Sequence, residues 1–591
     1  MRPGLGRLAA AAAIVALGAG ALPASPAAAS TTSPLGYVGP GTVRSAPAAR
    51  TAGSTAANPD GLTQPAHPDA RPPGHRLTAD RALAIADRVP AVRAAQAGSP
   101  GSYGVAFLKG PVEWQVSYYS RDNPRWGKEI AQVLIADATG RVLEAWTGFR
   151  VPWAMARGYP GAFGRKADAL YIWIPLSLAF VLPFINPRRP RRLLHLDLLA
   201  LSAFSVSLAF FNRGDVEASV PLSYPPLVYL LVRMVLAARR SSRPPQPIPL
   251  LVPASWLAVA VVFLIGFRVG LDLADSNVID VGYAGVIGAH RLVEGQTLYG
   301  AFPRDNQHGD TYGPAVYEAY VPFERILGWS GTWDDLPAAH WAAIAFDLLA
   351  VGLLFLIGRR IRGPTLGVAL AYAWVAYPFT LFALCTNTND ALVSVLVLTA
   401  LVAAARPAAR GAAAALAGLT KFAPLALAPV LALAPARGHS RRRTTALFCA
   451  GFALAALAAM APVLLHDNLH AFYERTIAFQ AGRGSPFSVW GLYGGLDGLQ
   501  TAVQAGAVGL ALALALFPRR ADLAGLAAAC AAVLIALQLG VTHWFYLYIV
   551  WFFPLVMLAL LGSGKQELLD RVGAHPVRAA DEHAHEPGVL V

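Results

Sequence analysis

The sequence predicts an all-α polytopic membrane protein that carries a small extracytoplasmic α+β domain near its N-terminus. Three observations predict this fold class. The 591-residue chain has a mean hydropathy of +0.47, and only 14% of its residues are charged. Apolar runs of about 17–25 residues, long enough to cross a bilayer core, recur between residues 169 and 562. Short arginine clusters separate these runs, as expected where basic loops stay on the cytoplasmic side of a membrane.

The net charge of +14 does not indicate a nucleic-acid-binding protein, because the basic residues are divided among short clusters such as 188–192 and 441–443. We expect membrane lipids as partners, and no nucleic acid. The three cysteines, Cys385, Cys449 and Cys530, lie in or at the ends of apolar runs. The sequence therefore implies neither a disulfide framework nor a cysteine metal site.

Residues 1–29 have the layout of a secretory signal peptide. Basic residues come first, then an apolar stretch from Leu8 to Leu22, then three alanines that end at Ala29. An uncleaved anchor is the alternative, and it also places the next segment outside the cytoplasm. Residues 30–75 are rich in Ala, Pro, Ser, Thr and Gly and lack periodicity, which predicts a disordered linker.

Residues 76–165 are predicted to form the soluble domain. Apolar spacing over residues 77–95 predicts a helix with Thr78 as its cap. The segments VAFLKG, EWQVSYYS, AQVLIADATG and RVLEAWTG follow with turn residues between them, and they predict β-strands. This pattern of a helix and strands, ending in IADATGRVLEAW, resembles a PepSY-type domain.

Residues 166–562 are predicted to form the membrane domain, with about eleven spans. Arginine clusters after the first, third and fifth runs then lie inside, so the loops 272–338 and 466–500 lie outside and the tail 563–591 is cytoplasmic. The predicted spans are 169–186, 194–211, 222–238, 250–271, 339–358, 364–384, 389–405, 444–465, 501–518, 521–540 and 544–562.

One further apolar segment, residues 411–435, does not fit the count. Basic residues flank both of its ends, so both ends are expected on the cytoplasmic side. Pro424, Pro429 and the interior Lys421 favour a re-entrant hairpin. An ordinary span that breaks the charge rule is the alternative.

Asp280 is the first candidate site residue. It follows the apolar run Leu250–Leu271 and opens a large polar loop, so it is expected at the membrane–water boundary. An ionisable residue in such a place is a functional-site hypothesis by default. The alternative is an N-cap, because the sequence after Asp280 can begin a helix.

The order of motifs in this loop is informative. Asp280 is followed by Tyr283, then by G-x-x-L-Y over 295–299, then by Tyr312 in T-Y-x-P, with a distal Pro322. Over roughly residues 250–562 this order resembles glycosyltransferase family 87. The resemblance implies a GT-C-like membrane mannosyltransferase that uses a polyprenyl-phosphate sugar. It also implies that Tyr283, Tyr299 and Tyr312 are substrate-binding residues, while the soluble domain and the first three spans lie outside it.

The chemistry of such a transfer gives Asp280 a role. A carboxylate at the membrane surface can take the proton of the acceptor hydroxyl as the new bond to the anomeric carbon forms. The transition state resembles an oxocarbenium ion, and an anionic phosphate leaves. Fixed positive charge can receive this phosphate without a general acid. Asp272 and Asp275 are competing candidates, and the pairing of Asp280 with Tyr283 favours Asp280.

Four residues are candidates for binding the donor phosphate. Arg475 and Arg483 lie in the second outer loop, and arginine suits paired contacts to phosphate oxygens. His543, at the outer start of the last span, could add a donor or be an interfacial histidine in an aromatic belt. Lys421 could stabilise the phosphate, but snorkelling to the cytoplasmic interface is the favoured interpretation.

Polar residues also gather in the turn CTNTND between two predicted spans. Asn389 and Asp390 are expected to bind substrate by lining the acceptor cleft together with Asn387, and capping of the next helix by Asn389 is the alternative. No metal-binding or nucleotide-binding motif occurs in a suitable context. A cofactor is therefore not expected, although Asp275 and Asp280 could hold a loosely bound divalent ion.

Together these features predict a plasma-membrane hexosyltransferase with an outward-facing site. The donor is expected to be a polyprenyl-phosphate hexose, mannose by resemblance, and the acceptor a cell-envelope glycolipid, polysaccharide or protein. Two alternatives remain. A transporter or lipid flippase would use ionisable residues within spans, such as Asp347, and would explain the interrupted segment 411–435. A non-enzymatic sensor would use the PepSY-like domain.

Overall fold

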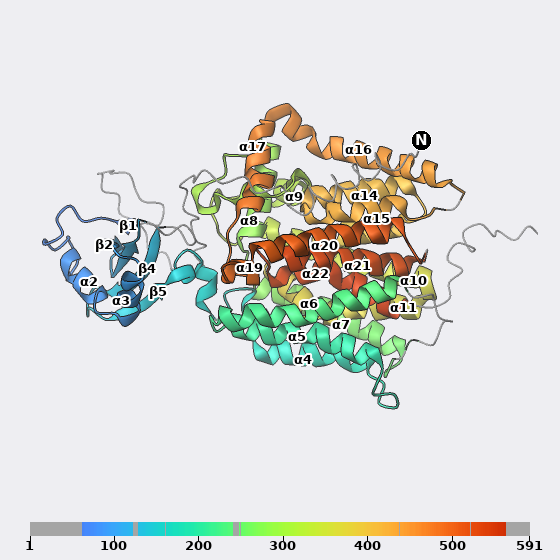
Figure 1. Cartoon of the computed structure of the whole chain (residues 1–591), viewed down its shortest axis with the longest axis horizontal. Coiled ribbons are helices and arrows are strands. Elements are labelled where there is room, and N and C mark those ends of the chain that lie inside the picture. The colour runs from blue at the N-terminus through green and yellow to red at the C-terminus, as the bar shows by residue number, and fades with distance from the viewer. Residues whose placement is uncertain are drawn as a thin grey trace, which may run out of the picture.

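The computed structural model describes residues 62–121, 128–159, 161–239, 248, 250–436, 438–520 and 522–562. The predicted signal peptide, residues 30–61 of the predicted linker and the predicted tail from residue 563 lie outside the described residues. The prediction of a disordered linker is wrong for its last part, because Leu62–Thr63 forms a strand that pairs with Tyr103–Lys109. The described chain forms a small sheet domain followed by a large bundle of helices that run side by side (Figure 1).

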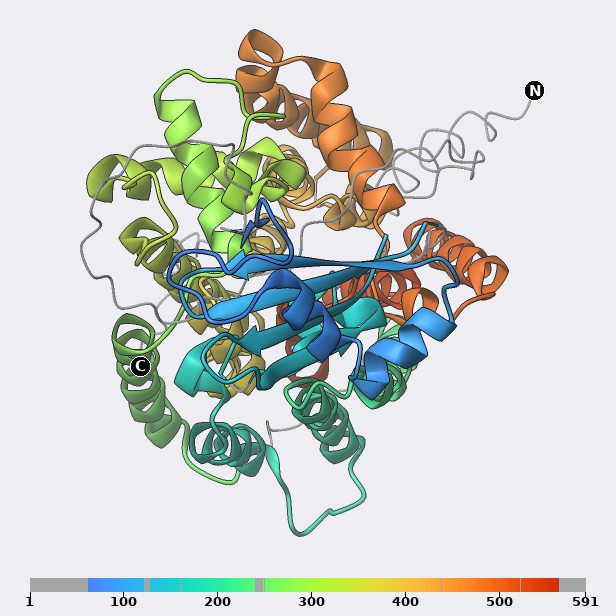
Figure 2. The same ribbon diagram turned by 90° about the vertical axis from the view of Figure 1, so that its left-hand side faces the viewer.

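The N-terminal domain is a five-stranded antiparallel sheet whose strands follow one another in chain order. Two helices cover one face of this sheet (Figure 2). Buried side chains from both layers, among them Trp114 and Val116, form a core separate from that of the bundle. The elements are β1 (Leu62–Thr63), α2 (Ala79–Ala86), α3 (Pro90–Ala97), β2 (Tyr103–Lys109), β3 (Glu113–Tyr119), β4 (Glu129–Ala136) and β5 (Val142–Thr147). The likeness to a PepSY domain stays a prediction.

The single helix predicted over residues 77–95 is wrong in one respect, because the structure has two helices there. Val89 has extended backbone and Pro90 begins α3. A residue before proline is sterically kept out of the helical region, so the chain breaks at this point. Thr78 caps α2 as predicted, since its hydroxyl accepts a hydrogen bond from the backbone N–H of Arg81 at 3.1 Å.

Seven helices of the described chain are long and apolar enough to cross a bilayer. An eighth candidate is the pair α11 (Pro364–Ala376) and α12 (Pro378–Cys385), which is bent by 58° at Pro378. The seven are α5 (Leu193–Phe211), α6 (Val216–Arg239), α7 (Ala254–Ala274), α10 (Pro337–Arg362), α16 (Arg441–His466), α20 (Asp497–Leu516) and α21 (Leu523–Gly540).

Shorter apolar helices account for the remaining predicted spans. Each predicted run falls on a helix or a bent helix pair, but the number that cross the membrane stays a prediction. The shorter elements are α4 (Leu170–Val181) with η4 (Leu182–Phe184), α13 (Asp390–Val402), and η9 (Tyr546–Tyr548) with α22 (Ile549–Leu561).

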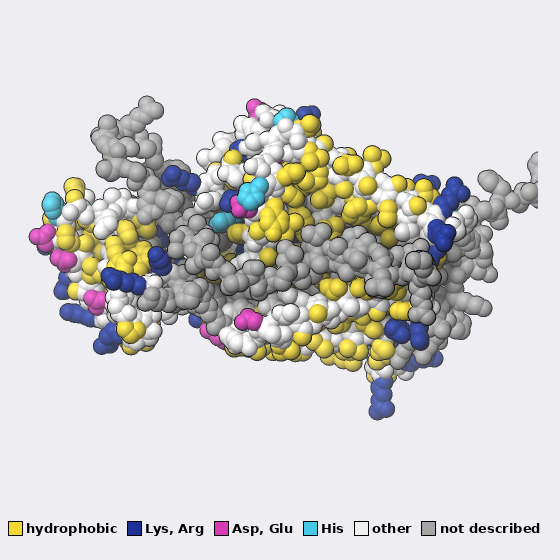
Figure 3. All heavy atoms as spheres, turned by 45° about the horizontal axis from the view of Figure 1, so that its top comes forward, with side chains coloured by type: hydrophobic (Ala, Val, Ile, Leu, Met, Phe, Trp, Pro, Cys, Tyr) yellow, Lys and Arg dark blue, Asp and Glu magenta, His cyan; other side chains and the backbone are white. Residues whose placement is uncertain are grey.

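The flank of the bundle is hydrophobic (Figure 3). On α7, Val262 and Phe263 are 72% and 70% exposed, and Leu454 and Leu457 on α16 are exposed in the same way. An apolar surface of this extent is suited to lipid rather than to water. Lys and Arg side chains gather at the end of the bundle away from the N-terminal domain (Figure 3). The orientation of the bundle in the membrane stays a prediction.

The segment predicted to be re-entrant turns back on itself. α14 (Pro407–Thr420) ends at Lys421, and η7 (Ala423–Leu427) and α15 (Ala428–Leu433) follow. The guanidinium of Arg410, near the start of α14, donates to the carbonyl of Ala434, just after α15, at 2.9 Å. The two ends of the segment therefore lie together and Lys421 is at its tip. This is the geometry that a re-entrant hairpin requires.

Short helices from the two large predicted outer loops lie at the end of the bundle nearest the N-terminal domain, where α8, α17 and α19 are labelled in Figure 1. The first loop contributes α8 (Asp280–Val293), η5 (Arg304–Asn306), η6 (Gly309–Thr311) and α9 (Pro314–Leu327). The second loop contributes α17 (Leu469–Tyr473), the π-helix η8 (Glu474–Ala478), α18 (Phe479–Gly482) and α19 (Val489–Leu492).

Residues 148–159 and 161–168, which we call the connector, join the N-terminal domain to the bundle. The connector contains η1 (Gly148–Arg150), η2 (Ala154–Arg157) and η3 (Arg165–Asp168). Ala156 and Phe163 are buried in the core of the bundle, not in the core of the sheet domain. The predicted boundary at residue 165 therefore falls inside a segment that packs on the membrane domain.

Candidate active site

Asp280 is held by a contact between two segments that are far apart in the sequence. Backbone N–H groups of Asn277 and Ile279 donate to the carbonyls of Cys385 and Thr386 at 3.1 and 3.2 Å. A Cβ atom at Gly282 would lie 2.1 Å from the backbone oxygen of Asn387, so only glycine allows α8 to come this close. The segment that carries Asp280 is thereby fixed against the turn that carries Asn389 and Asp390.

Asp280 is the first residue of α8, and Ile279 occupies the N-cap position without a side-chain cap. The side chain of Asp280 is partly exposed to solvent. Burial raises the pKa of its carboxyl, and the nearby Arg483 guanidinium is the strongest of the influences that oppose this rise. The N–H of Val281 and the ammonium of Lys421 also lower this pKa, whereas the carboxylate of Asp390 raises it. Asp280 thus shares one electrostatic site with two cations and a second acid.

Lys421 reaches this site from the tip of the hairpin. Its Nζ lies 2.5 Å from Oδ1 of Asp390, and only 8% of the residue is exposed. The indole N–H of Trp551 donates to the same Oδ1 at 2.8 Å. The ammonium also lies over the rings of Tyr312, Tyr548 and Trp551, at 5.3, 5.6 and 5.3 Å from their centres. The expectation that Lys421 snorkels to the cytoplasmic interface is therefore wrong.

The turn before α13 holds polar atoms that no described residue satisfies. Both amide atoms of Asn389 and Oδ2 of Asp390 are buried without a hydrogen-bond partner in the described part of the chain. Asn389 occupies the N-cap position of α13, but its side chain makes no capping bond. The capping alternative therefore does not account for this side chain. Buried polar groups are almost always hydrogen-bonded, so these atoms are suited to a polar ligand or water.

The two candidate arginines differ in what they already bind. Nε of Arg475 donates to Oδ2 of Asp310 at 2.7 Å, and its NH2 group donates to the carbonyl of Gln307 at 2.5 Å. Arg483 forms no hydrogen bond or ion pair with the residues that the structure describes; its guanidinium lies 5.4 Å from the ring centre of Trp153 and 5.8 Å from that of Phe479. Of the two, Arg483 keeps its hydrogen-bond donors available for a ligand.

His543 lies in the same region. Its Nδ1 is 2.9 Å from the hydroxyl oxygen of Ser485, and its ring stacks on Trp153 with centres 5.8 Å apart. Burial lowers the pKa of His543 well below its usual value, and the charges of Arg483 and Lys421 lower it further. The imidazole is therefore neutral near pH 7. It can offer a hydrogen bond to a ligand but not a positive charge.

The three tyrosines of the motif have different positions. The hydroxyl of Tyr283 is buried and donates to Asp305 at 3.0 Å. Tyr299 is also buried, and its hydroxyl donates to the carbonyl of Tyr312 at 3.0 Å. Tyr312 alone is partly exposed and lies beside Lys421. Tyr283 and Tyr299 thus support the loop that positions Tyr312, and Tyr312 is the one next to the charged cluster.

The other acidic candidates are engaged elsewhere. Asp275 pairs with Lys166, and Oδ2 of Asp272 lies 3.2 Å from Nδ1 of His340. Neither aspartate is brought into the cluster around Asp280. Among the described residues, no group of three or more His, Cys, Asp or Glu side chains is arranged to hold a metal ion.

Sequence analysis missed Trp153, Tyr548 and Trp551. Trp153 lies in the connector, which has no recognisable motif, so nothing in the sequence indicated its contact with Arg483 and His543. Tyr548 and Trp551 belong to a strongly aromatic stretch that is also typical of a membrane interface. Their contact with Lys421 depends on the hairpin, which lies more than a hundred residues away in the sequence.

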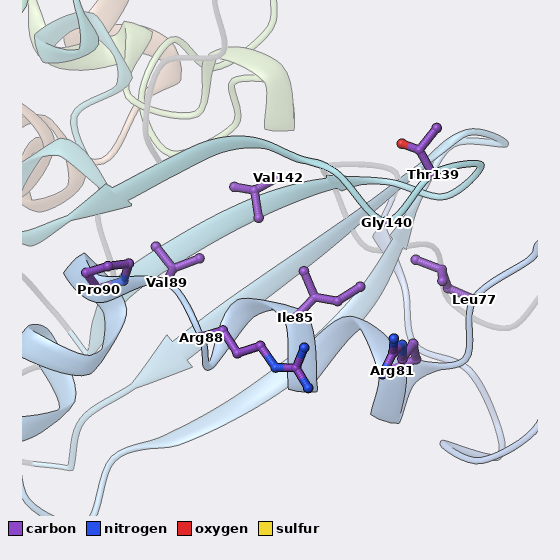
Figure 4. Close-up of a pocket in the computed structure, with 9 residues that line it drawn as sticks. All are labelled: Leu77, Arg81, Ile85, Arg88, Val89, Pro90, Thr139, Gly140 and Val142. Carbon is purple, nitrogen blue, oxygen red and sulfur yellow. The ribbon is translucent and has the colours of Figure 1, made fainter.

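A separate cavity of about 550 Å³ opens on the N-terminal domain (Figure 4). Its floor is apolar, with Ile85, Val89 and Val142, and Arg81 and Arg88 lie at its edge. None of the predicted site residues lines it. This cavity is therefore distinct from the cluster around Asp280.

Comparison with known protein families gives one result. The model of glycosyltransferase family 87 matches residues 311–541. The match includes Tyr312, Asn389, Asp390, Lys421 and Arg483; His543 lies just after its end, and Asp280 lies well before its start. No curated protein matches the chain. The family match supports a multi-pass membrane glycosyltransferase, which takes a sugar donor and an acceptor.

Proposed function

Starting from the match to glycosyltransferase family 87, we propose that this protein transfers a hexose from a polyprenyl-phosphate donor to a hydroxyl group of a cell-envelope acceptor. By family resemblance the hexose is mannose. The observation that carries the proposal is a partly exposed carboxylate, Asp280, whose pKa is lowered by the charges of the two cations Arg483 and Lys421. A base and a cation in one site are what this reaction needs.

In the proposed reaction, the proton of the acceptor hydroxyl passes to the carboxylate of Asp280. The acceptor oxygen bonds to the anomeric carbon, and the bond between that carbon and the donor phosphate oxygen breaks. Its electron pair leaves with the phosphate. Burial raises the pKa of Asp280, so the carboxylate is a stronger base than one in water.

Arg483 is the proposed receiver of the leaving phosphate. Its guanidinium is partly exposed, makes no ion pair with the described residues and acts on Asp280 through its charge. Arginine presents planar paired donors that match phosphate oxygens. His543, neutral and close by, adds a hydrogen bond, whereas the guanidinium of Arg475 is already committed to Asp310.

The unsatisfied atoms of Asn389 and Asp390 are the proposed contacts to sugar hydroxyls. An amide and a carboxylate side by side can donate to and accept from hydroxyl groups. Lys421 holds Oδ1 of Asp390, which leaves Oδ2 for the ligand. Lys421 also contributes positive charge close to the donor phosphate.

The outer face is the proposed location of the reaction, and the plasma membrane the proposed membrane. Helix α8, which begins at Asp280, lies at the end of the bundle nearest the N-terminal domain (Figure 1), and Lys and Arg side chains gather at the other end of the bundle (Figure 3). Basic loops remain in the cytoplasm, so this arrangement supports an outward-facing site and an extracytoplasmic N-terminal domain.

The two alternatives explain less. Asp347, the residue that a transporter would use, is bound by Arg268 at 2.5 Å and by the indole N–H of Trp374 at 2.8 Å, so it joins helices within the bundle. A ligand sensor could use the cavity beside Arg81 and Arg88. It would leave the charged cluster around Asp280 without a role.

The decisive experiment uses reconstituted protein, a labelled polyprenyl-phosphate mannose donor and an envelope glycolipid fraction as acceptor. Asp280→Asn keeps the size and one acceptor oxygen of the side chain but removes the base. We expect transfer to fall by about a hundredfold or more, with donor binding retained. Asp497→Asn is the matched control, because Asp497 begins α20 as Asp280 begins α8. Near-normal transfer by Asp280→Asn would end the proposed mechanism.

A further inference from the structure

We infer that the connector, residues 148–159 and 161–168, is part of the active site, and that Trp153 is a positioning residue that holds Arg483 in place for the donor phosphate. The inference rests on the proposed function, in which Arg483 receives that phosphate. It gives the N-terminal domain a structural link to the reaction that neither the family match nor the motifs of the sequence assign, since the match begins only at residue 311.

The connector is bonded to the sheet of the N-terminal domain. The guanidinium of Arg157 donates to Oε1 of Gln132, on β4, at 2.7 Å. The same guanidinium donates to the carbonyls of Arg150 and Val151 at 2.8 and 3.0 Å. One arginine thus folds the connector on itself and fixes it to the sheet.

The connector is also bonded to the loop between α5 and α6. Arg150 donates to the carbonyl of Gly214 at 2.9 Å and to the carboxylate of Glu217 at 2.7 Å. Gly158 has a φ of +75°, and a Cβ atom there would lie 2.2 Å from the backbone nitrogen of Gly214. The two backbones are therefore in direct contact, and no larger residue fits at position 158.

A third set of bonds joins the connector to the segment that carries the proposed base. Oδ1 of Asn277 accepts the backbone N–H of Gly164 at 2.6 Å, and Nδ2 of Asn277 donates to the carbonyl of Ala162 at 2.9 Å. Asn277 lies three residues before Asp280, in the segment that leads into α8. The connector is thus tied to the base through one buried amide.

Trp153 is the residue through which the connector enters the site. Its ring stacks on His543 with centres 5.8 Å apart and meets Phe487 edge-on at 5.3 Å. The guanidinium of Arg483 lies over the same ring at 5.4 Å. An aromatic ring attracts a cation through its quadrupole without occupying its hydrogen-bond donors. Trp153 can therefore fix Arg483 while leaving its N–H groups free for phosphate oxygens.

This arrangement predicts a specific kinetic effect. Trp153→Ala should raise the KM for the polyprenyl-phosphate sugar by about tenfold, an effect between that of an exposed and that of a fully desolvated cation–π contact, because Arg483 is partly exposed. Trp153→Phe, which keeps an aromatic face, should recover most of the loss. Trp153→Leu keeps apolar packing but has no aromatic face, so its KM should stay as high as that of Trp153→Ala. Trp256→Leu is the control, since Trp256 is 69% exposed on the flank of the bundle.

A double-mutant cycle tests whether Trp153 acts through Arg483. In an Arg483→Ala background, Trp153→Leu should cause no further rise in donor KM, whereas in the otherwise unchanged protein it should. Equal effects of Trp153→Leu in both backgrounds, or equal KM values for the Phe and Leu variants, would overturn the inference. If Trp153→Ala does not fold, the Trp153→Phe and Trp153→Leu variants and the double-mutant cycle still test whether Trp153 positions Arg483.

The result separates this inference from the proposed function. An inactive Asp280→Asn protein combined with additive effects of Trp153 and Arg483 would remove the inference and keep the glycosyltransferase mechanism. An active Asp280→Asn protein would remove the mechanism itself. One transfer assay, with polyprenyl-phosphate mannose as the donor, measures the Asp280→Asn variant and the Trp153 and Arg483 variants alike.

Discussion

The proton affinity of Asp280 is set by a small number of neighbours that act in opposite directions. Burial and the carboxylate of Asp390 raise the pKa of Asp280, and the cations Arg483 and Lys421 lower it. The net effect leaves this pKa above the usual 3.8. Because only the ionised carboxylate accepts a proton, the rate of transfer should fall as the pH falls through this raised pKa.

This balance predicts two opposite shifts in the pH profile. Arg483→Gln removes the strongest influence that lowers the pKa of Asp280, so the acid limb of kcat/KM should move to higher pH. Asp390→Asn removes an influence that raises this pKa, so the acid limb should move to lower pH. Profiles of residual activity for the two variants measure the shifts. If the acid limb moved in the same direction in both variants, the group that titrates there would not be Asp280.

The two arginines of the second outer loop should differ in what their loss does. Arg475→Ala removes the ion-pair partner of the buried Asp310 carboxylate, which among the described residues keeps only its hydrogen bond from the N–H of Gly300, and should cost roughly 1–3 kcal/mol of stability. Arg483→Ala breaks no ion pair with the described residues, so its melting temperature should stay close to that of the unchanged protein. Arg483→Lys should still lose transfer activity, because the paired geometry is gone. Full activity of both Arg483 variants would exclude Arg483 from the site.

At the scale of elements, the hairpin formed by α14, η7 and α15 brings a charge into the interior. A buried ion pair such as Lys421 with Asp390 is costly to break from one side only, because the remaining charge loses its partner. The pair also joins the hairpin to α13. The hairpin therefore has both a structural and a proposed chemical role.

Single and double replacements of this pair separate the two roles. Lys421→Met should lower the free energy of unfolding by about 3–5 kcal/mol, because Asp390 is left charged and buried. Lys421→Met combined with Asp390→Leu should recover much of this stability and still fail to transfer sugar. Thermal unfolding in detergent and the transfer assay give the two readouts. Activity in the stable double variant would show that neither residue takes part in the reaction.

The helices themselves could be predicted from the sequence, because apolar length and flanking charge are local properties of the chain. Even the hairpin was predictable, since arginines stand on both sides of residues 411–435. The partners of side chains were harder to predict. Tyr283 is three residues after Asp280, yet its hydroxyl binds Asp305. Sequence spacing places residues on one helix face, but which loop covers that face depends on the whole fold.

At the scale of the whole molecule, the arginine clusters and the position of the site predict one topology. In a Cys449→Ser background, Gln296→Cys should react with a membrane-impermeant maleimide on intact cells, because this exposed residue lies in the outer loop. Ser440→Cys, beside the basic residues 441–443, should react only after permeabilisation. Cys385 and Cys530 are buried and should not react with the maleimide. Labelling of residue 440 on intact cells would contradict both the hairpin and the outward-facing site.

The close approach at Gly282 has a consequence for how substrate preference could change during evolution or design. Because Gly282 has no side chain, the base can lie close to the turn that carries Asn389. A Cβ atom at this position would collide with the backbone of Asn387. Misplacement of reacting groups by about 1 Å can cost about a hundredfold in rate. A larger sugar therefore cannot be accommodated by widening this gap. Changes in donor size have to come from the loops that face this gap, because those loops can change in length without altering the spacing at Gly282.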